Sequence, residues 1–179
     1  MNTCGRQAPE RVTIPADTAG IIDMFCTPPF FPETEYDRKA CADAQPLDYP
    51  FEDIVLKGYA WGEGPVVLLL HGWGSRASHM ASIARVVSRA GFPVVALDMP
   101  GHGGSLKDGA DSRSSLPRFC RALAIFAGTV GKLHAVIGHS LGGAAAVLTA
   151  GGASVAPKGV IDTERVVAIS SPAGLETIV

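Results

Sequence analysis

The stretch that decides the fold is residues 133–147, with the sequence LHAVIGHSLGGAAAV. It predicts a buried strand, a very tight turn and then a helix, with Ser140 at the apex of the turn between Gly138 and Gly142. A strand that turns directly into a helix forces strained dihedral angles on the apex residue, and side chains at both glycine positions would clash. We therefore expect a serine hydroxyl that is held out above the edge of a sheet.

An alternative for this segment is a membrane-spanning helix, because residues 133–150 contain no Asp, Glu, Lys or Arg. The glycines at 138, 142 and 143 weaken a helix, and no basic cluster flanks either end. The N-terminus also lacks a signal pattern of basic and then apolar residues. We therefore expect no membrane span and a cytoplasmic location.

Composition excludes other classes of protein. The chain has 179 residues, enough for a domain with a sizeable core, of which 47% are hydrophobic and 18% charged. Its formal net charge is -2, and no basic stripe is present, so we expect no nucleic-acid partner. Its four cysteines lack metal-ligand spacing. We expect free thiols, no metal and no cofactor.

Strand and helix patterns alternate around the central stretch. The apolar runs 66–70 and 93–97 predict strands buried on both faces, and 166–169 predicts one more buried strand. Apolar spacing predicts a helix that is capped by Ser75 or Ser78 and ends at Gly91, and another that starts near Leu116. This alternation predicts a doubly wound α/β domain with a mostly parallel sheet.

The N-terminal part of the chain has a different character. Residues 1–50 contain seven prolines, which cut the segment into short pieces. Residues 51–57 and 58–61 are expected to form two short strands joined at Lys57-Gly58. We therefore divide the chain into an irregular N-terminal arm, 1–50, and a domain, 51–179.

Three distinctive loops follow predicted strands: HGWG at 71–74, DMPGHGGS at 98–105 and GHSLG at 138–142. In doubly wound sheets, ligands bind at the carboxyl ends of the strands, where these loops lie. The order and separation of the loops resemble the α/β-hydrolase family over residues 51–175. The resemblance implies that the protein hydrolyses an ester or related acyl bond of a small molecule through a covalent acyl-enzyme.

The resemblance also implies roles for particular residues. Ser140 would be the nucleophile, and the backbone N–H groups of Trp73 and Leu141 would form the oxyanion hole. The residues expected to support the elbow and the loop are His71, Gly72, Gly138 and Gly142. His71 is expected to brace the loop by hydrogen bonds rather than to act as a base.

Other polar residues near the motifs have a structural interpretation. Asp98 and His102 match a structural turn of the family, so we do not expect them to be an acid–base pair. The side chain of His139 is expected to point away from the Ser140 side chain, because the two residues are adjacent in sequence.

The catalytic base is missing from the pattern. A serine nucleophile needs a histidine oriented by a carboxylate, and in this family both follow the serine. No histidine follows Ser140, and the only later carboxylates are Asp162, Glu164 and Glu176. The first two precede the last predicted strand, and Glu176 is a weak candidate after it. We interpret the chain as the N-terminal two-thirds of an α/β-hydrolase, without its C-terminal strands and inactive as given.

Two alternatives stay open. The chain could be a non-catalytic binding or assembly protein that keeps the cleft, or its site could be completed by a histidine of another chain. In the partial domain, the strand at 166–169 has an exposed apolar edge, so self-association through that strand is expected. Esterase, lipase, thioesterase and acyltransferase activities are equally compatible with the motifs.

Overall fold

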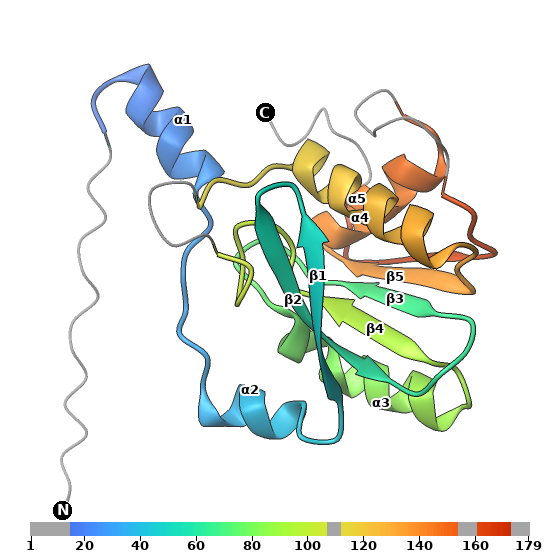
Figure 1. Ribbon diagram of the computed structural model, residues 1–179. Coiled ribbons are helices and arrows are strands. Elements are labelled where there is room, and N and C mark those ends of the chain that lie inside the picture. Colours follow the sequence, from blue (N-terminus) through green and yellow to red (C-terminus); the bar gives the residue numbers. More distant parts are fainter. Residues whose placement is uncertain (1–14, 107–111, 154–160, 173–179) are drawn as a thin grey trace, which may run out of the picture.

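A computed structural model describes residues 15–106, 112–153 and 161–172. Its core is a six-stranded sheet in the order β1-β2-β4-β3-β5-β6 (Figure 1). The strands are β1 (Gln45–Phe51), β2 (Ile54–Trp61), β3 (Val67–Leu70), β4 (Val94–Leu97), β5 (Ala135–His139) and β6 (Val166–Ile169). The last four run parallel, whereas β2 pairs antiparallel with both β1 and β4. The predicted mostly parallel α/β fold is confirmed.

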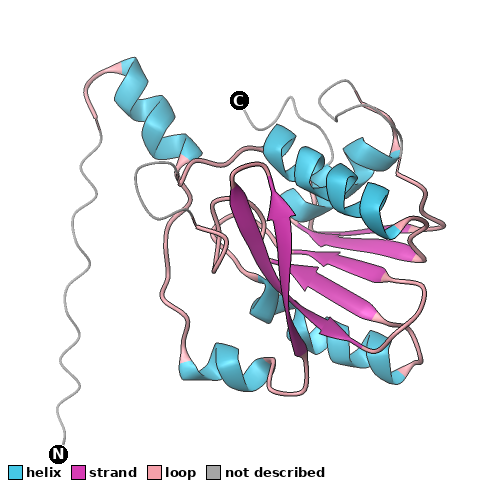
Figure 2. Ribbon diagram, viewed as in Figure 1, coloured by secondary structure: helices cyan, strands magenta, loops and turns pink. Residues whose placement is uncertain are grey.

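Helices cover both faces of this sheet (Figure 2). The 3-10 turn η1 (Ala77–Met80) and α3 (Ala81–Arg89) pack on one face, and α4 (Leu116–Val130) and α5 (Leu141–Ala150) pack on the other. The N-terminal segment contributes α1 (Thr18–Cys26) and α2 (Glu35–Ala40). Within the described ranges, no helix has both the length and the apolar character needed to cross a bilayer. The segment weighed as a membrane span instead forms β5, a turn and α5.

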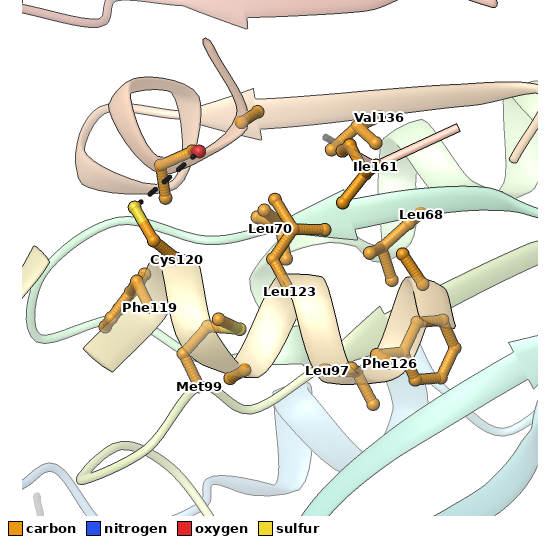
Figure 3. Packing of buried hydrophobic residues seen from close by; sticks show 14 of the residues in the cluster. Leu68, Leu70, Leu97, Met99, Phe119, Cys120, Leu123, Phe126, Val136 and Ile161 are labelled. Atoms are coloured by element: carbon orange, nitrogen blue, oxygen red, sulfur yellow. Dashed lines mark hydrogen bonds between the residues drawn. The ribbon is translucent and has the colours of Figure 1, made fainter. Parts of the chain in front are cut away.

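The central strands bury side chains on both faces, as their continuous apolar runs predict. In β3, Leu68 and Leu70 join the hydrophobic cluster beneath α4 and α5, whereas Val67 and Leu69 join the cluster beneath α3. Figure 3 shows Leu123 of α4 beside Leu70 in the larger cluster. The helix layers therefore fix the carboxyl ends of β3, β4 and β5, where the three loops begin.

The predicted hairpin is correct in kind but wrong in position. The strands pair from Gln45 with Ala60 to Phe51 with Ile54, so the turn lies at Glu52 and Asp53 and not at Lys57-Gly58. Gly58 lies inside β2, where a Cβ atom would overlap the carbonyl oxygen of Ala96 in β4. This glycine therefore permits a close approach between two strands rather than a turn.

The described part of the N-terminal arm is more regular than its prolines indicated. It contains α1, α2 and most of β1. Thr34 caps α2 reciprocally with Asp37, because each side chain accepts the other residue's backbone N–H. The arm thus leads directly into the edge of the sheet.

The predicted cap of α3 is wrong. Met80 occupies the N-cap position and makes no side-chain hydrogen bond to the helix. Ser78 instead donates its hydroxyl to Asp37, and Ser75 bonds to His79. The two serines therefore connect the loop to other parts of the chain rather than starting the helix.

Strand β6 has the predicted bounds but is not buried. In the described sheet it pairs with β5 alone, and its residues are half-buried or exposed, with Val167 43% exposed. The sequence predicted the strand and its bounds correctly, but the burial of a strand depends on whether other elements pack beside it. This edge position matches the exposed strand on which the expected self-association rests.

Candidate active site

Ser140 lies between the end of β5 and the start of α5, with φ 51° and ψ −119°. This conformation is rare and strained for a residue with a side chain. A Cβ atom on Gly142 would lie 2.6 Å from the carbonyl oxygen of Leu70, and one on Gly138 would overlap the backbone of Gly142. Both glycines are therefore required by the close packing of the turn. Ser140 is half-buried and its hydroxyl makes no capping hydrogen bond to α5.

The loop after β3 packs directly against this turn. A Cβ atom on Gly72 would lie 3.0 Å from the Cβ of Ser140. The next residue, Trp73, has a backbone N–H with no acceptor among the described residues. The N–H of Leu141 is in the first turn of α5, where such groups have no acceptor within the helix. The N–H groups of Trp73 and Leu141 thus have no acceptor among the described residues.

His71 connects the loops after β3 and β4. Its ring is fully buried, and its Nε2 accepts the Met99 N–H at 2.9 Å. The proton is therefore on Nδ1, which donates to the carbonyl oxygen of Gly72 at 2.7 Å. Burial lowers the pKa of His71 to about 4, so the ring is neutral near pH 7. Because backbone groups occupy both ring nitrogens, neither is free to act as a base.

Asp98 ties the loop after β4 to η1. Its carboxylate accepts the N–H of Ala77 at 2.5 Å and the N–H of Gly104 at 2.6 Å. Burial raises the pKa of Asp98, although these backbone hydrogen bonds act in the opposite direction. Ser105 closes the same loop by donating to the backbone carbonyl of Asp98. The position of the loop is therefore set by a buried, hydrogen-bonded carboxylate.

His102 lies in an aromatic cluster and is not hydrogen-bonded to Asp98. Its Nδ1 lies 3.0 Å from the carbonyl oxygen of Pro100, and its Nε2 has no partner within the described part of the chain. The ring packs edge-on against Trp73 with centroids 5.1 Å apart. Burial lowers the pKa of His102 to about 4. This geometry agrees with a packing role beneath the loop after β3.

The N-terminal segment packs against the loop after β3, which the sequence did not indicate. Pro29 packs on Gly74, where a Cβ atom would lie 2.9 Å from the proline ring. Arg76 donates to the carbonyl oxygen of Phe31 at 2.6 Å. In Figure 1 this segment runs between α1 and α2. It therefore holds the loop after β3 from outside, opposite the bonds made by His71.

Asp37 fastens this segment to the loop. Its carboxylate accepts hydrogen bonds from Thr34 and, at 2.8 Å, from the hydroxyl of Ser78. Its Oδ1 also lies 3.4 Å from Nε2 of His79. Burial acts to raise the pKa of Asp37, but the hydrogen bonds from Thr34 and Ser78 outweigh it and lower the pKa to about 2. The carboxylate is therefore charged throughout the neutral range.

Among the described residues, the carboxylates that follow Ser140 in the sequence lie away from it. Glu164 precedes β6 and contacts Lys132 and His134, so it lies at the opposite end of the sheet from Ser140. The hydrogen bond from Lys132 lowers the pKa of Glu164. Asp162 also precedes β6, and Glu176 lies outside the described residues.

His139 is exposed, with its Nδ1 close to Gly72 and away from any hydrogen-bond partner in the described ranges. Within those ranges, no histidine ring is hydrogen-bonded to Ser140.

Comparisons with known proteins agree with this geometry. Residues 67–177 match the alpha/beta hydrolase family. Protein phosphatase methylesterase 1 of Mus musculus is 39% identical over 92 residues, which cover 49% of this chain and 24% of the methylesterase. Pimeloyl-(acyl-carrier protein) methyl ester esterase of Aeromonas salmonicida is 38% identical over 84 residues, or 46% of this chain and 31% of the esterase.

A solved structure extends the similarity to the fold. A bacterial membrane phospholipase A is 25% identical, with a TM-score of 0.61, over 76% of this chain and 42% of that chain. The aligned part of this chain thus spans less than half the length of each of these three relatives. The match over more than half of this chain and the strand–turn–helix around Ser140 show that the chain belongs to the alpha/beta hydrolase family.

Proposed function

We propose that this chain carries the nucleophile and the oxyanion hole of a serine hydrolase that cleaves ester or related acyl bonds. The observation that carries the proposal is the strained turn at Ser140, with Gly72 packed against it. Two relatives are, by name, a methylesterase and a methyl ester esterase, which supports a small ester as the substrate class.

In the proposed reaction, the Ser140 hydroxyl oxygen attacks the carbonyl carbon of the ester and gives its proton to a base. The carbonyl oxygen becomes negatively charged and binds the N–H groups of Trp73 and Leu141. The tetrahedral intermediate then expels the alcohol, which takes up the proton and leaves an acyl group on Ser140. Water attacks that acyl group in the same way and releases the carboxylic acid.

A second candidate follows from the surroundings of Ser140. Since no described histidine ring is bonded to its hydroxyl, the chain could instead be a non-catalytic member of the family that binds a ligand in the same cleft. The two functions differ in one measurable property, which is whether Ser140 forms a covalent bond to an acyl group.

The test uses p-nitrophenyl butyrate with the purified chain, with and without added imidazole as a replacement base. We expect slow attachment of one butyryl group to Ser140, faster with imidazole, detected by intact-protein and peptide mass spectrometry. The oxyanion hole and binding alone can leave roughly 10³-fold catalysis when triad members are missing. Ser140→Ala corrects for direct hydrolysis by imidazole, and Ser82→Ala, at an exposed serine of α3, is the matched control.

Acylation that requires Ser140 and survives Ser82→Ala would support the serine hydrolase. Equal release of p-nitrophenol by the wild type and Ser140→Ala, with no butyryl group on the protein, would refute it. That second outcome would favour the non-catalytic candidate.

A further inference from the structure

A cavity of about 370 Å³ lies apart from Ser140, which does not line it. Four segments enclose it: the N-terminal segment, the β1–β2 hairpin, the loop after β3 and the loop after β4. Phe30 and Pro46 form its apolar part, whereas Lys57, Tyr59 and Arg76 contribute hydrogen-bond donors. Its volume is within the range of pockets that hold small organic molecules.

The carboxylates that face this cavity have partners of their own. Asp48 pairs with Lys57 at 2.6 Å. Glu33 accepts from the hydroxyl of Tyr59 at 3.2 Å and lies 3.5 Å from Arg38. Asp98 accepts two backbone N–H groups, as described above. The lysine and all three acidic groups of the lining are therefore already engaged.

Arg76 is different, because its charge has little compensation. It is only 8% exposed, yet its one hydrogen bond within the described residues goes to the carbonyl oxygen of Phe31. No carboxylate of those residues lies within ion-pair distance, and Asp98 acts on Arg76 only from further away. None of its nitrogens is both inaccessible to solvent and without a hydrogen-bond partner. The unpaired donors of this buried guanidinium therefore face accessible space, and Arg76 lines this cavity of about 370 Å³ as well as a small one of about 10 Å³.

We propose that this cavity binds a small organic monocarboxylate, whose carboxylate pairs with Arg76 while its apolar body lies against Phe30 and Pro46. A guanidinium offers a planar pair of N–H donors that matches a carboxylate in two parallel hydrogen bonds. A single negative charge neutralises the single uncompensated cation. A phosphate dianion fits less well, since Glu33 and Asp98 face the same space and repel the second charge.

The test measures binding to the whole chain by isothermal titration calorimetry, with 4-phenylbutyrate as the probe. The neutral 4-phenylbutanol has the same apolar body without the charge, and phenyl phosphate carries the alternative anion. We expect saturable binding of 4-phenylbutyrate and at least about ten-fold weaker binding of the other two probes. Binding of 4-phenylbutyrate that does not saturate, or equal binding of the alcohol, would overturn the proposal. Tighter binding of phenyl phosphate would overturn the carboxylate assignment.

Two variants locate the binding. Arg76→Gln keeps a donor near Phe31 but removes the charge, and Pro46→Trp fills the apolar part while leaving Arg76 unchanged. Each should weaken 4-phenylbutyrate binding about ten-fold or more, whereas Arg89→Gln in the last turn of α3 should not. Unchanged affinity in Pro46→Trp would contradict the site even where Arg76→Gln fails to fold. Ser140→Ala should bind normally, so this result is separate from the test of hydrolysis.

Discussion

Lowering the pH from 7 towards 4 should destabilise this protein strongly, because two buried histidines must stay neutral in the folded state. His71 and His102 both have a pKa of about 4, against an ordinary value of 6.5, and in both burial is the main cause. Between these two pH values the unfolded chain binds protons that the folded chain does not. The free energy of unfolding therefore falls as the pH falls through this window.

The size of the effect follows from the same numbers. The difference between 6.5 and 4 corresponds to about 3 kcal/mol for each histidine once the pH is below 4. Asp98 acts with the opposite sign, since its raised pKa makes the folded state bind a proton above pH 3.8. Asp37 affects the free energy of unfolding only at lower pH, because the stabilising effect of its negative charge is lost between pH 3.8 and about 2. Domains are typically stable by only about 5–15 kcal/mol, so the two histidines can remove most of that.

The measurement is urea unfolding at several pH values between 7.5 and 4.5, followed by circular dichroism. His102→Gln removes one of the two titrating groups and should reduce the slope of unfolding free energy against pH to about half. His139→Gln, at an exposed histidine, should leave the slope unchanged. A flat profile between pH 6.5 and 4.5, or a full slope in His102→Gln, would refute the assignment of neutral buried histidines.

Three further predictions concern stability and association. Gly142→Ala should destabilise the protein by about 1–3 kcal/mol in thermal melts or prevent folding, because the added Cβ would meet the Leu70 and His71 carbonyls. The control Gly128→Ala, on the open surface of a helix, should be neutral or stabilising in the same melts. Asp37→Asn should cost about 1–3 kcal/mol in urea unfolding, since the amide offers one acceptor oxygen where the carboxylate offers two. The wild type should self-associate through β6 in light scattering, and Val167→Lys should reduce the apparent mass; a monomeric wild type would contradict this.

Sequence reasoning succeeded where the constraint on a residue is local along the chain. The run from β5 through Ser140 into α5 could be predicted because the apolar strand, the glycines and the helix are contiguous. The helix from Leu116 was also predictable, since Ser115 caps it and its apolar spacing is regular. In both cases the local pattern and the tertiary packing favour the same structure.

Sequence reasoning failed where the constraint joins distant segments. Gly58 was interpreted as a turn residue because its close contact, the Ala96 carbonyl, is not visible in the neighbouring sequence. Arg76 and Phe31 are 45 positions apart, and Ser78 and Asp37 are 41 apart, so no local pattern marks either pair. The capping pattern at Thr34 and Asp37 could have located α2, but not its contact with the oxyanion loop.

These distant contacts bear on the proposed chemistry. The loop that holds Trp73 is bonded on its inner side through His71 to the loop after β4, and on its outer side to the N-terminal segment. An oxyanion hole is effective only when its N–H donors are fixed before the charge develops. The N-terminal segment, which carries no catalytic motif, therefore contributes to the geometry on which the proposed reactivity of Ser140 rests.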